Sequence, residues 1–427
     1  MGMTAVEKIL ARASGLPAVR PGDFIEPVPD LIMIHDNHVM ATKNELDSLG
    51  IDRLFDPDRV VMVSDHDVIY VNERAIERGA FNRRAAQAWG VKQFYDVGRG
   101  GHGHVFPTET GLITPGTFYF DNDRHCTNAG GVGAVALRVG EEMSTVLATG
   151  SVWVKVPESI RITLRGTLRP GVMGRDLGFV IARMFKQDNI GCEIDYRIVE
   201  FAGDLDPITL ANRVAMCGTP TEIGAVAVYF PPSTAVIEHA SAKGLRVVRP
   251  TYSDADARFA ADLTLDVAGI EPQIALPGGV QNAVNVSEAA GTPVQHAFIG
   301  SCGSGMWDDL VAAAAVLKGH RVASGVRLFV TPGSEYATRR LHTDGLLSIF
   351  QEAGALLIPA GCGACAGGRT APVFSGEVSI STAVNNGAGR MGAKDAQLYL
   401  GNPATVAASA IAGKITDPRE LMTARST

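Results

Sequence analysis

Short apolar runs alternate with helical patterns along most of the chain. Residues 58–68 (DRVVMVSDHDV) predict a strand with its exit loop, because a compact apolar run stands directly before polar residues. Residues 74–90 predict a helix that Gly90 ends, and residues 91–97 predict another strand. The order recurs later, with strands expected at 294–300 and 326–333 and helices at 307–319, 345–354 and 402–415. Such alternation predicts α/β layers around mostly parallel sheets.

Two changes in pattern divide the chain into three predicted α/β domains. The segment ESIRITLRGTLRPG begins a new unit after a long first one. The stretch IEPQIALPGGVQNA, residues 270–283, contains two prolines and a Gly-Gly pair and is typical of a linker into a third unit. The predicted domains are therefore 1–156, 157–272 and 273–427.

Composition and charge narrow the class of protein. A chain of 427 residues that is 46% hydrophobic and 19% charged predicts a soluble globular protein with sizeable cores. A formal net charge of -7 argues against nucleic acid or an anionic membrane as partner. No apolar run approaches the roughly 20 residues of a membrane span. The N-terminus predicts an amphipathic helix ending at Gly15 rather than a signal peptide, so a cytoplasmic location is expected.

Two of the six cysteines, Cys362 and Cys365, stand in a C-x-x-C spacing within PAGCGACAGG. Such a pair can be a redox dithiol, half of a zinc site, part of an iron–sulfur site, or two inert buried thiols. CGAC differs by one residue from the CGPC of thioredoxin-like proteins. The AGGRTAPVF that follows is a poor helix start, however, and this weakens the redox interpretation.

A third cysteine, Cys302, lies in FIGSCGSGMWDDL, on a glycine-rich loop after a predicted strand and before a predicted helix. The positive end of that helix favours a thiolate, and open α/β sheets bind ligands at the carboxyl ends of strands. Three thiolates could hold zinc with one histidine or three corners of a [4Fe–4S] cluster. The glycines of both loops favour the cluster, because they let backbone N–H groups approach inorganic sulfide. Three ligands would leave one iron open as a Lewis acid.

Together these segments resemble the aconitase superfamily along nearly the whole chain. The likeness is greatest to the large subunits of 3-isopropylmalate dehydratase, homoaconitase and dimethylmalate dehydratase. It is carried by GSC followed by CGxC, by DPDRVVMVSDHDV, by DRHCTNAGGVGAVA and by the closing YLGNPATVAASAIAGKI. The resemblance implies three α/β domains with mostly parallel sheets around a shared iron–sulfur site. It also implies a hydro-lyase that acts on a small hydroxy di- or tricarboxylate.

The resemblance implies roles only for residues that match the family's motifs. The implied cluster ligands are Cys302, Cys362 and Cys365. The implied acid–histidine pairs are Asp65 with His66, His104 with Asp123, and His125 with Glu222. Independently, a carboxylate beside an imidazole fixes its tautomer and raises its pKa, which suits protonation of a departing hydroxide. A structural role is expected for His102, His239, His296, His320 and His342, while the roles of His35 and His38 stay open.

Four positions in three segments depart from the family pattern. Arg124 replaces a small serine that contacts substrate, and Asn385 replaces an arginine, whereas Arg390 is retained. The cluster loop has Gly303-Ser304 where the family has Thr-Asn. One hypothesis is that Arg124 supplies, from the opposite wall, the carboxylate-binding charge lost at Asn385, because arginine matches two carboxylate oxygens. The other is that Arg124 forms only a salt bridge.

The family's mobile fourth domain carries a Gly-Ser-Ser-Arg segment whose serine removes the substrate's α-proton. No such segment occurs here. The resemblance therefore implies a separate small swivel-domain subunit that supplies this serine and completes the site. The alternative function is a non-catalytic iron–sulfur or redox-sensing paralogue whose chemistry was lost with the changes at Arg124 and Asn385.

Overall fold

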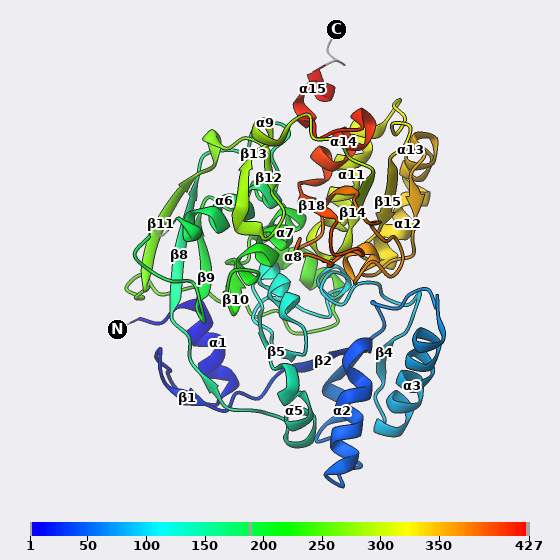
Figure 1. Cartoon of the computed structure of the whole chain (residues 1–427). Helices are drawn as coiled ribbons and strands as arrows, with labels where there is room; N and C mark the ends of the chain where they lie inside the picture. The colour runs from blue at the N-terminus through cyan, green and yellow to red at the C-terminus, as the bar shows by residue number, and fades with distance from the viewer. Residues whose placement is uncertain (1, 188–189, 424–427) are drawn as a thin grey trace. The chain divides into compact units, whose positions relative to one another are not determined.

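The computed structural model describes residues 2–187 and 190–423, which form two compact units (Figure 1). Each of the three larger sheets draws its strands from one of the three predicted domains, but the division into three domains itself stays a prediction. Unit 1 comprises Met1–Leu164, Ile194–Asp206 and Gly224–Leu265, and unit 2 comprises Arg165–Glu193, Pro207–Ile223 and Asp266–Thr427.

A five-stranded sheet in unit 1 has the order β4-β3-β2-β5-β6, and all its strands are parallel. The central strands are nearly all apolar and buried at every position, as expected for parallel strands covered on both faces. The strands are β2 (Leu31–His35), β3 (Val60–Val63), β4 (Gln93–Tyr95), β5 (Phe118–Asp121) and β6 (Val135–Arg138). The helices are α1 (Ala5–Ala13), α2 (Asp36–Ser48), α3 (Glu73–Trp89), α4 (Phe106–Thr110) and α5 (Met143–Thr149), with 3₁₀ helices η1 (Pro57–Arg59), η2 (Arg124–Val132) and η3 (Gly140–Glu142).

A second, four-stranded sheet in unit 1 has the order β10-β9-β8-β11. The 3₁₀ helix η2 packs against β10, where Gly130 lies so close to Val228 that a Cβ would collide with the backbone carbonyl. The strands are β8 (Ser159–Arg165), β9 (Ile198–Gly203), β10 (Ala227–Tyr229) and β11 (Ala261–Asp266), beside the ribbon β1 (Phe24–Ile25) with β7 (Val154–Lys155) and the helix α8 (Thr234–Lys243).

Unit 2 is built on a seven-stranded sheet of order β13-β12-β18-β17-β14-β15-β16. The run from β18 to β16 is parallel, and β12 pairs antiparallel with both its neighbours. The strands are β12 (Gln273–Ala275), β13 (Ala283–Asn285), β14 (His296–Gly300), β15 (Arg327–Thr331), β16 (Leu356–Leu357), β17 (Val378–Ser381) and β18 (Gln397–Leu400). The helices are α6 (Gly174–Lys186), α7 (Leu210–Thr221), α9 (Val286–Ala289), α10 (Ser301–Ser304), α11 (Trp307–Leu317), α12 (Glu335–Thr343), α13 (Leu346–Ala353), α14 (Pro403–Ala412) and α15 (Pro418–Thr423), with 3₁₀ helices η4 (Val267–Gly269), η5 (Val280–Asn282) and η6 (Gly363–Cys365).

The predicted helices and strands named above are confirmed to within a few residues. The helix expected to end at Gly90 is α3, and Gly90 caps it with φ 70°. Two expectations are wrong. The predicted linker at 270–283 is a β-hairpin of unit 2, because its Pro-Gly-Gly forms the turn between β12 and β13. Cys302 lies in the one-turn helix α10 rather than in a loop.

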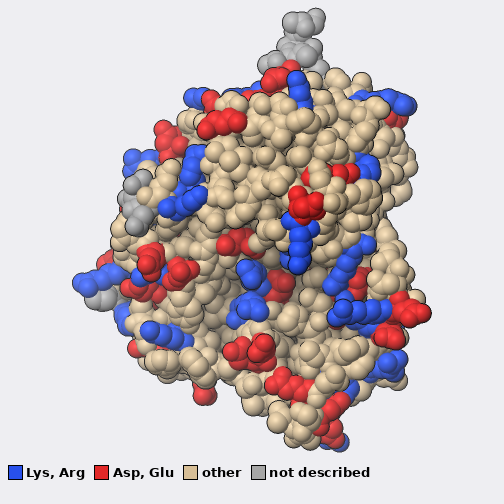
Figure 2. All heavy atoms as spheres, in the orientation of Figure 1, with Lys and Arg blue, Asp and Glu red and all other residues tan. Residues whose placement is uncertain are grey.

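The surface shows no segregation of charge on the face drawn in Figure 2, where acidic and basic side chains are interspersed. This mixture matches a modest formal net charge of -7 spread over the chain. Within residues 2–187 and 190–423, no helix combines the length and the apolar character needed to cross a membrane.

Candidate active site

Three buried side chains of unit 1 form a row along the carboxyl edge of the five-stranded sheet. Asp65 follows β3, His35 ends β2 and Asp121 ends β5, and these strands are adjacent and parallel. His35 Nδ1 lies 3.0 Å from both carboxylate oxygens of Asp65, and His35 Nε2 lies 3.5 Å from Asp121 Oδ1. All three side chains are fully buried. The row is a direct consequence of strand order, because parallel strands end at the same edge.

Electrostatic attraction outweighs burial within this row. Burial alone would lower the pKa of His35, but Asp65 and Asp121 raise that pKa well above its ordinary value. Burial would likewise raise the pKa of Asp65, yet His35 and His66 hold it well below its usual range. The pKa of Asp121 is also lowered, since His35 and His104 overcome the effect of burial. The row therefore consists of an imidazolium between two carboxylates.

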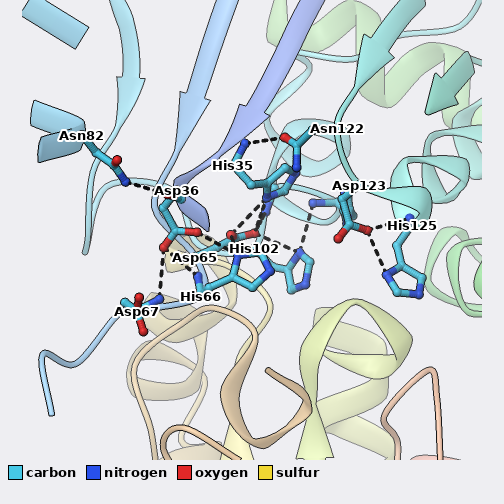
Figure 3. Close-up of polar contacts among 12 residues, drawn as sticks. His35, Asp36, Asp65, His66, Asp67, Asn82, His102, Asn122, Asp123 and His125 are labelled. Atoms are coloured by element: carbon cyan, nitrogen blue, oxygen red, sulfur yellow. Dashed lines mark hydrogen bonds and ion pairs between the residues drawn. The ribbon is translucent and has the colours of Figure 1, made fainter. Parts of the chain in front are cut away.

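His66 completes the predicted pair with Asp65 and adds a second carboxylate. His66 Nδ1 lies 2.8 Å from Asp65 Oδ1 and 2.8 Å from Asp36 Oδ1 (Figure 3). Asp36 Oδ2 also accepts the backbone N–H groups of His66 and Asp67, so this carboxylate fixes the loop as well as the ring. The His66 side chain is 13% exposed, more than the His35 and Asp65 beside it. It is therefore the member of this group that solvent reaches.

His104 and His102 approach the same row from the segment before α4. His104 Nε2 lies 3.3 Å from Asp121 Oδ2, and its ring centroid lies 4.5 Å from that of His35. His102 Nδ1 lies 3.4 Å from Asp65 Oδ2 and accepts the backbone N–H of His104. Burial lowers the pKa of His102 well below its ordinary value, so this ring is neutral. His102 therefore helps to position the backbone of His104.

Asp123 and His125 form a separate pair at the start of η2. The Asp123 carboxylate accepts the backbone N–H of His125 at 2.9 Å and lies 3.1 Å from His125 Nδ1. Burial would raise the pKa of Asp123, but His125 holds it well below its usual range. The contacts thus pair Asp123 with His125 and His104 with Asp121, although the ligand atoms of His104, Asp123 and His125 all lie within 4.8 Å of one another.

Sequence reasoning left the role of His35 open and missed Asp36 and Asp121 as members of this group. Each stands at the carboxyl end of a strand or on the next residue, as in LIMIHD and FYFD. That placement was the available signal. It became informative only with the strand order, which brings the ends of β3, β2 and β5 together.

The three cysteines of unit 2 lie at or after carboxyl ends of parallel strands in the seven-stranded sheet. Cys302 follows β14, and Cys362 and Cys365 follow β16. All three thiols are buried and none is in a disulfide. Ser301, directly before Cys302, has φ 65°, which is uncommon for a residue other than glycine and is found most often at functional sites. The residue of positive φ thus lies at the junction between β14 and the one-turn helix that carries Cys302.

Close packing ties the C-x-x-C segment to the strands beside Cys302. Gly363 has φ 60°, and a Cβ there would come within 2.8 Å of the Phe298 ring and 2.5 Å of Thr331 Oγ1. Phe298 belongs to β14 and Thr331 to β15, so Cys362 and Cys365 are held against the same edge from which Cys302 emerges. Soft thiolate donors of this kind suit zinc or an iron–sulfur cluster.

Arg390 and Asn385 lie on the loop after β17, next to the β14 exit. Arg390 Nη2 lies 3.5 Å from Cys365 Sγ. The negative charge of an ionised Cys365 outweighs burial and raises the pKa of Arg390 above its ordinary value. Asn385 Nδ2 donates to the Glu222 carboxylate, and Asn385 Oδ1 accepts the Gly387 N–H at 2.8 Å. Asn385 thus holds Glu222 within unit 2, a contact that its sequence context did not indicate.

For the other residues that the sequence singled out, the role in the site stays a prediction. Arg124 is exposed at the first position of η2. His38, on α2, is half-buried, and burial lowers its pKa. Two sets of three side chains in unit 1 have ligand atoms within 4.8 Å of one another. One set is His35, His104 and Asp121, and the other is His35, Asp65 and His66. The ion pairs of the row already account for that proximity.

Comparison with known proteins gives a consistent result. The family model described as "Aconitase family (aconitate hydratase)" matches residues 7–293 and 287–413. The 3-isopropylmalate dehydratase large subunit 1 of Methanopyrus kandleri is 38% identical over 421 residues, covering 98% of this chain and 99% of that protein. The protein of the same name from Archaeoglobus fulgidus is 39% identical over 430 residues, covering 99% and 100%. The large subunit of Moorella thermoacetica is 36% identical and covers 99% and 100%.

A solved structure supports the same fold. The holo-form crystal structure of aconitase X from Thermococcus kodakaraensis matches with a TM-score of 0.51, covering 89% of this chain and 87% of that one. At 12% sequence identity this match shows the fold alone. The predicted α/β class with mostly parallel sheets, aconitase-like in arrangement, is thereby confirmed.

Proposed function

Because the chain belongs to the aconitase family, we propose that it is the large, iron–sulfur subunit of a two-subunit dehydratase. The substrate would be a small hydroxy di- or tricarboxylate of the isopropylmalate, dimethylmalate or homocitrate type. The observation that carries the proposal is the set of three buried thiols at one edge of parallel strands. The printed names of the relatives, which are large subunits of 3-isopropylmalate dehydratase, support the two-subunit form.

The donor set of unit 2 suits a [4Fe–4S] cluster. Cys302, Cys362 and Cys365 would be its ligands, and Arg390 beside Cys365 would offset its negative charge. When bound through three thiolates, such a cluster supplies an iron with an open coordination position, which acts as a Lewis acid. The positive φ values at Ser301 and Gly363 fall on residues directly beside Cys302 and Cys362.

The imidazoles and carboxylates of unit 1 would handle the proton that the departing hydroxyl needs. His66 Nδ1 is engaged by Asp65 and Asp36, both of which stabilise an imidazolium. Protonated His66 would then deliver its proton from Nε2 to the leaving oxygen, as a general acid. His104 and His125, each beside an aspartate, would hold and orient the other polar groups of the substrate.

The step that this chain does not supply is removal of the α-proton. A serine of the small swivel-domain subunit would act as that base. Release of the alkene would give a simple dehydration, whereas addition of water at the neighbouring carbon would give a net isomerisation.

Arg124, Asn385 and Arg390 would determine which carboxylates are accepted. Arg124 is exposed on η2 and carries a permanent charge, while Asn385 is engaged by Glu222. Changing Arg124→Ser should alter the range of dicarboxylates that are turned over, measured as kcat/KM for each member of a panel. An unchanged range would leave Arg124 with a salt-bridge role only.

The proposal is tested on protein purified anaerobically. About four irons and four sulfides per chain are expected, and Cys302→Ala should lose them, because three thiolates hold the cluster. Cys217→Ala is the matched control, since Cys217 is a buried thiol of the same unit within α7. An iron-free chain, or spectroscopy that shows four protein thiolates on the cluster, would overturn the proposal.

Catalysis is tested by adding a small subunit and following the absorbance of a new carbon–carbon double bond. Substrate-dependent absorbance that appears only with the small subunit is expected. A cluster-loaded pair that turns over no hydroxy-carboxylate would instead support the non-catalytic paralogue.

A further inference from the structure

Unit 2 contains a fully buried arginine, Arg175, in the first turn of α6. The position of this turn is fixed by contact with α7. A Cβ at Gly174 would collide with the backbone of Asn212, and the Gly174 N–H donates to Asn212 Oδ1 at 2.7 Å. The backbone from which the Arg175 side chain extends is therefore fixed by the packing of α6 on α7.

Most of the hydrogen-bonding capacity of Arg175 is unused. Nη2 donates to the Ala383 carbonyl, and the guanidinium carbon lies 4.9 Å from the centroid of the Phe179 ring. Nε and Nη1 find no hydrogen-bond partner among the residues that the structure describes. A buried donor without a partner costs about 1–3 kcal/mol, and more when it is charged. Arg175 is retained at this position despite that cost.

The surroundings of Arg175 show what would compensate its charge. Burial lowers its pKa to about 10, so it remains a cation at neutral pH. The thiols of Cys302 and Cys365 oppose that lowering, followed by Glu222 and Asp309. Its Nη1 lies against Gly303, the residue after Cys302, because a Cβ on that glycine would come within 3.3 Å of Nη1. The unused donor Nη1 thus lies beside the residue that directly follows the first predicted ligand.

We propose that Arg175 is a positioning and charge-balancing residue for the anionic group held by Cys302 and Cys365, with Nε–H and Nη1–H as its donors. This inference rests on the proposed cluster. Three thiolates on a core of charge about +2 leave a net negative charge, which a buried guanidinium would offset from within unit 2. Arg175 lies far from the cysteines in sequence and belongs to no metal-ligand motif.

The stability of the protein without its cluster distinguishes this role from a purely structural one. If the unused donors serve the cluster, Arg175 is uncompensated when the cluster is absent. Arg175→Met, which removes an uncompensated cation, should then leave the apo protein as stable as the wild type or more stable. The same change should lower the stability of the protein that contains the cluster. The effect on stability is therefore expected to reverse sign with loading.

The test compares wild type, Arg175→Met and Arg175→Lys, each in apo and reconstituted form. For Arg175→Met we expect faster iron loss to a ferrous chelator and a more negative midpoint potential. Removing a nearby cation disfavours the reduced cluster, and a tenfold change in its one-electron equilibrium is about 59 mV. Arg175→Lys keeps the charge but loses the several donors of the guanidinium. Its rate of iron loss and its midpoint potential should therefore lie between those of wild type and Arg175→Met.

Arg213→Met is the matched control, because Arg213 is a nearly fully buried arginine of the same unit and donates through Nε to the Ile208 carbonyl. It should destabilise apo and loaded protein alike without moving the potential. Unchanged potential and iron loss in Arg175→Met, or its failure to fold in the apo form, would overturn the inference. Wild-type protein that binds no iron and sulfide would instead refute the proposed function.

Discussion

Asp65 is the residue on which the polar group of unit 1 depends. Its carboxylate lies within 3.0 Å of ring nitrogens of His35 and His66 and accepts the Gly103 N–H at 2.9 Å. A fully buried carboxylate with this many donors remains ionised, because each donor stabilises the charged form. Asp65 therefore sets both the charge and the orientation of the histidines around it.

Asp65→Asn should lower kcat by about 10²–10⁴-fold, the usual contribution of a positioned acid or base. The amide cannot offset an imidazolium, so the pKa of His35 should fall. Steady-state kinetics of the two-subunit enzyme, with circular dichroism to confirm folding, checks this expectation. Glu200→Gln is the control, since Glu200 is a buried carboxylate of unit 1 bound by the hydroxyls of Ser159 and Ser253. Equal kcat in both variants would contradict the role of Asp65.

His296 provides a test of pH-dependent stability in unit 2. Burial lowers its pKa to about 4, and its ring contacts Ser379 Oγ and the Ala371 carbonyl, as suits a neutral imidazole. Because the unfolded chain takes up the proton near pH 6.5, the stabilising contribution is present above that pH and is lost as pH falls toward 4. Its structural role was predicted from the sequence.

The loss should be measurable by denaturant unfolding of the apo protein at pH 7 and pH 5. Between pH 7 and pH 5 the free energy of unfolding of the wild type should fall by about 2 kcal/mol more than that of His296→Gln. Glutamine can form the same kind of hydrogen bonds but does not titrate. Parallel pH profiles for the two proteins would show that His296 does not protonate on unfolding.

At the scale of elements, short parallel strands bring the candidate residues together. In unit 1 the ends of β3, β2 and β5 carry Asp65, His35 and Asp121, and in unit 2 the exits of β14, β16 and β17 carry the cysteines and Arg390. A one-residue shift in the pairing of β2 or β5 would turn His35 or Asp121 to the opposite face of the sheet. The site thus depends on register as much as on residue identity.

The 3₁₀ helix η2 tests this dependence, because it carries Asp123 and His125 and rests on β10. Gly130→Ala should lower the free energy of unfolding by about 1–3 kcal/mol, since its Cβ would meet the Val228 carbonyl and force η2 from the sheet. Gly269→Ala is the control, because a Cβ at Gly269 would meet nothing within 4 Å. Denaturant unfolding of both variants checks the difference. Similar stabilities would show that η2 adjusts without cost.

At the scale of the whole molecule, the family assignment is the firmest conclusion. The predicted resemblance to the aconitase superfamily is confirmed by a family model that covers most of the chain and by relatives of similar length. The same family match and relatives confirm the prediction of an aconitase-type hydro-lyase. The cofactor, the partner and the identity of the substrate stay proposals.

Dependence on a partner is expected to appear as saturable activation. Titrating the loaded large chain with small subunit should raise turnover until the two are near equal amounts, because each site needs one external base. Initial rates across the titration check the stoichiometry. Full turnover by the large chain alone would show that it contains its own base.

The local sequence determined which segments are helices and strands and which family the chain belongs to. Apolar runs and glycine caps act over a few residues, so β14, α11 and the end of α3 at Gly90 were predictable. The motif residues Asp65, His66 and the three cysteines were visible in the same way. The Pro-Gly-Gly of 277–279 was misleading, because a hairpin turn and a linker share the same composition.

Only the tertiary structure decided which side chains meet. His35 and Asp121 joined the site because β2 lies between β3 and β5, an order that no local pattern encodes. Arg175 became significant because α6 packs on α7 and buries a guanidinium with unused donors. The physical reason is that periodicity and turn chemistry are properties of neighbouring residues. Strand order, burial and the charges around a titratable group arise from the packing of segments distant in the chain.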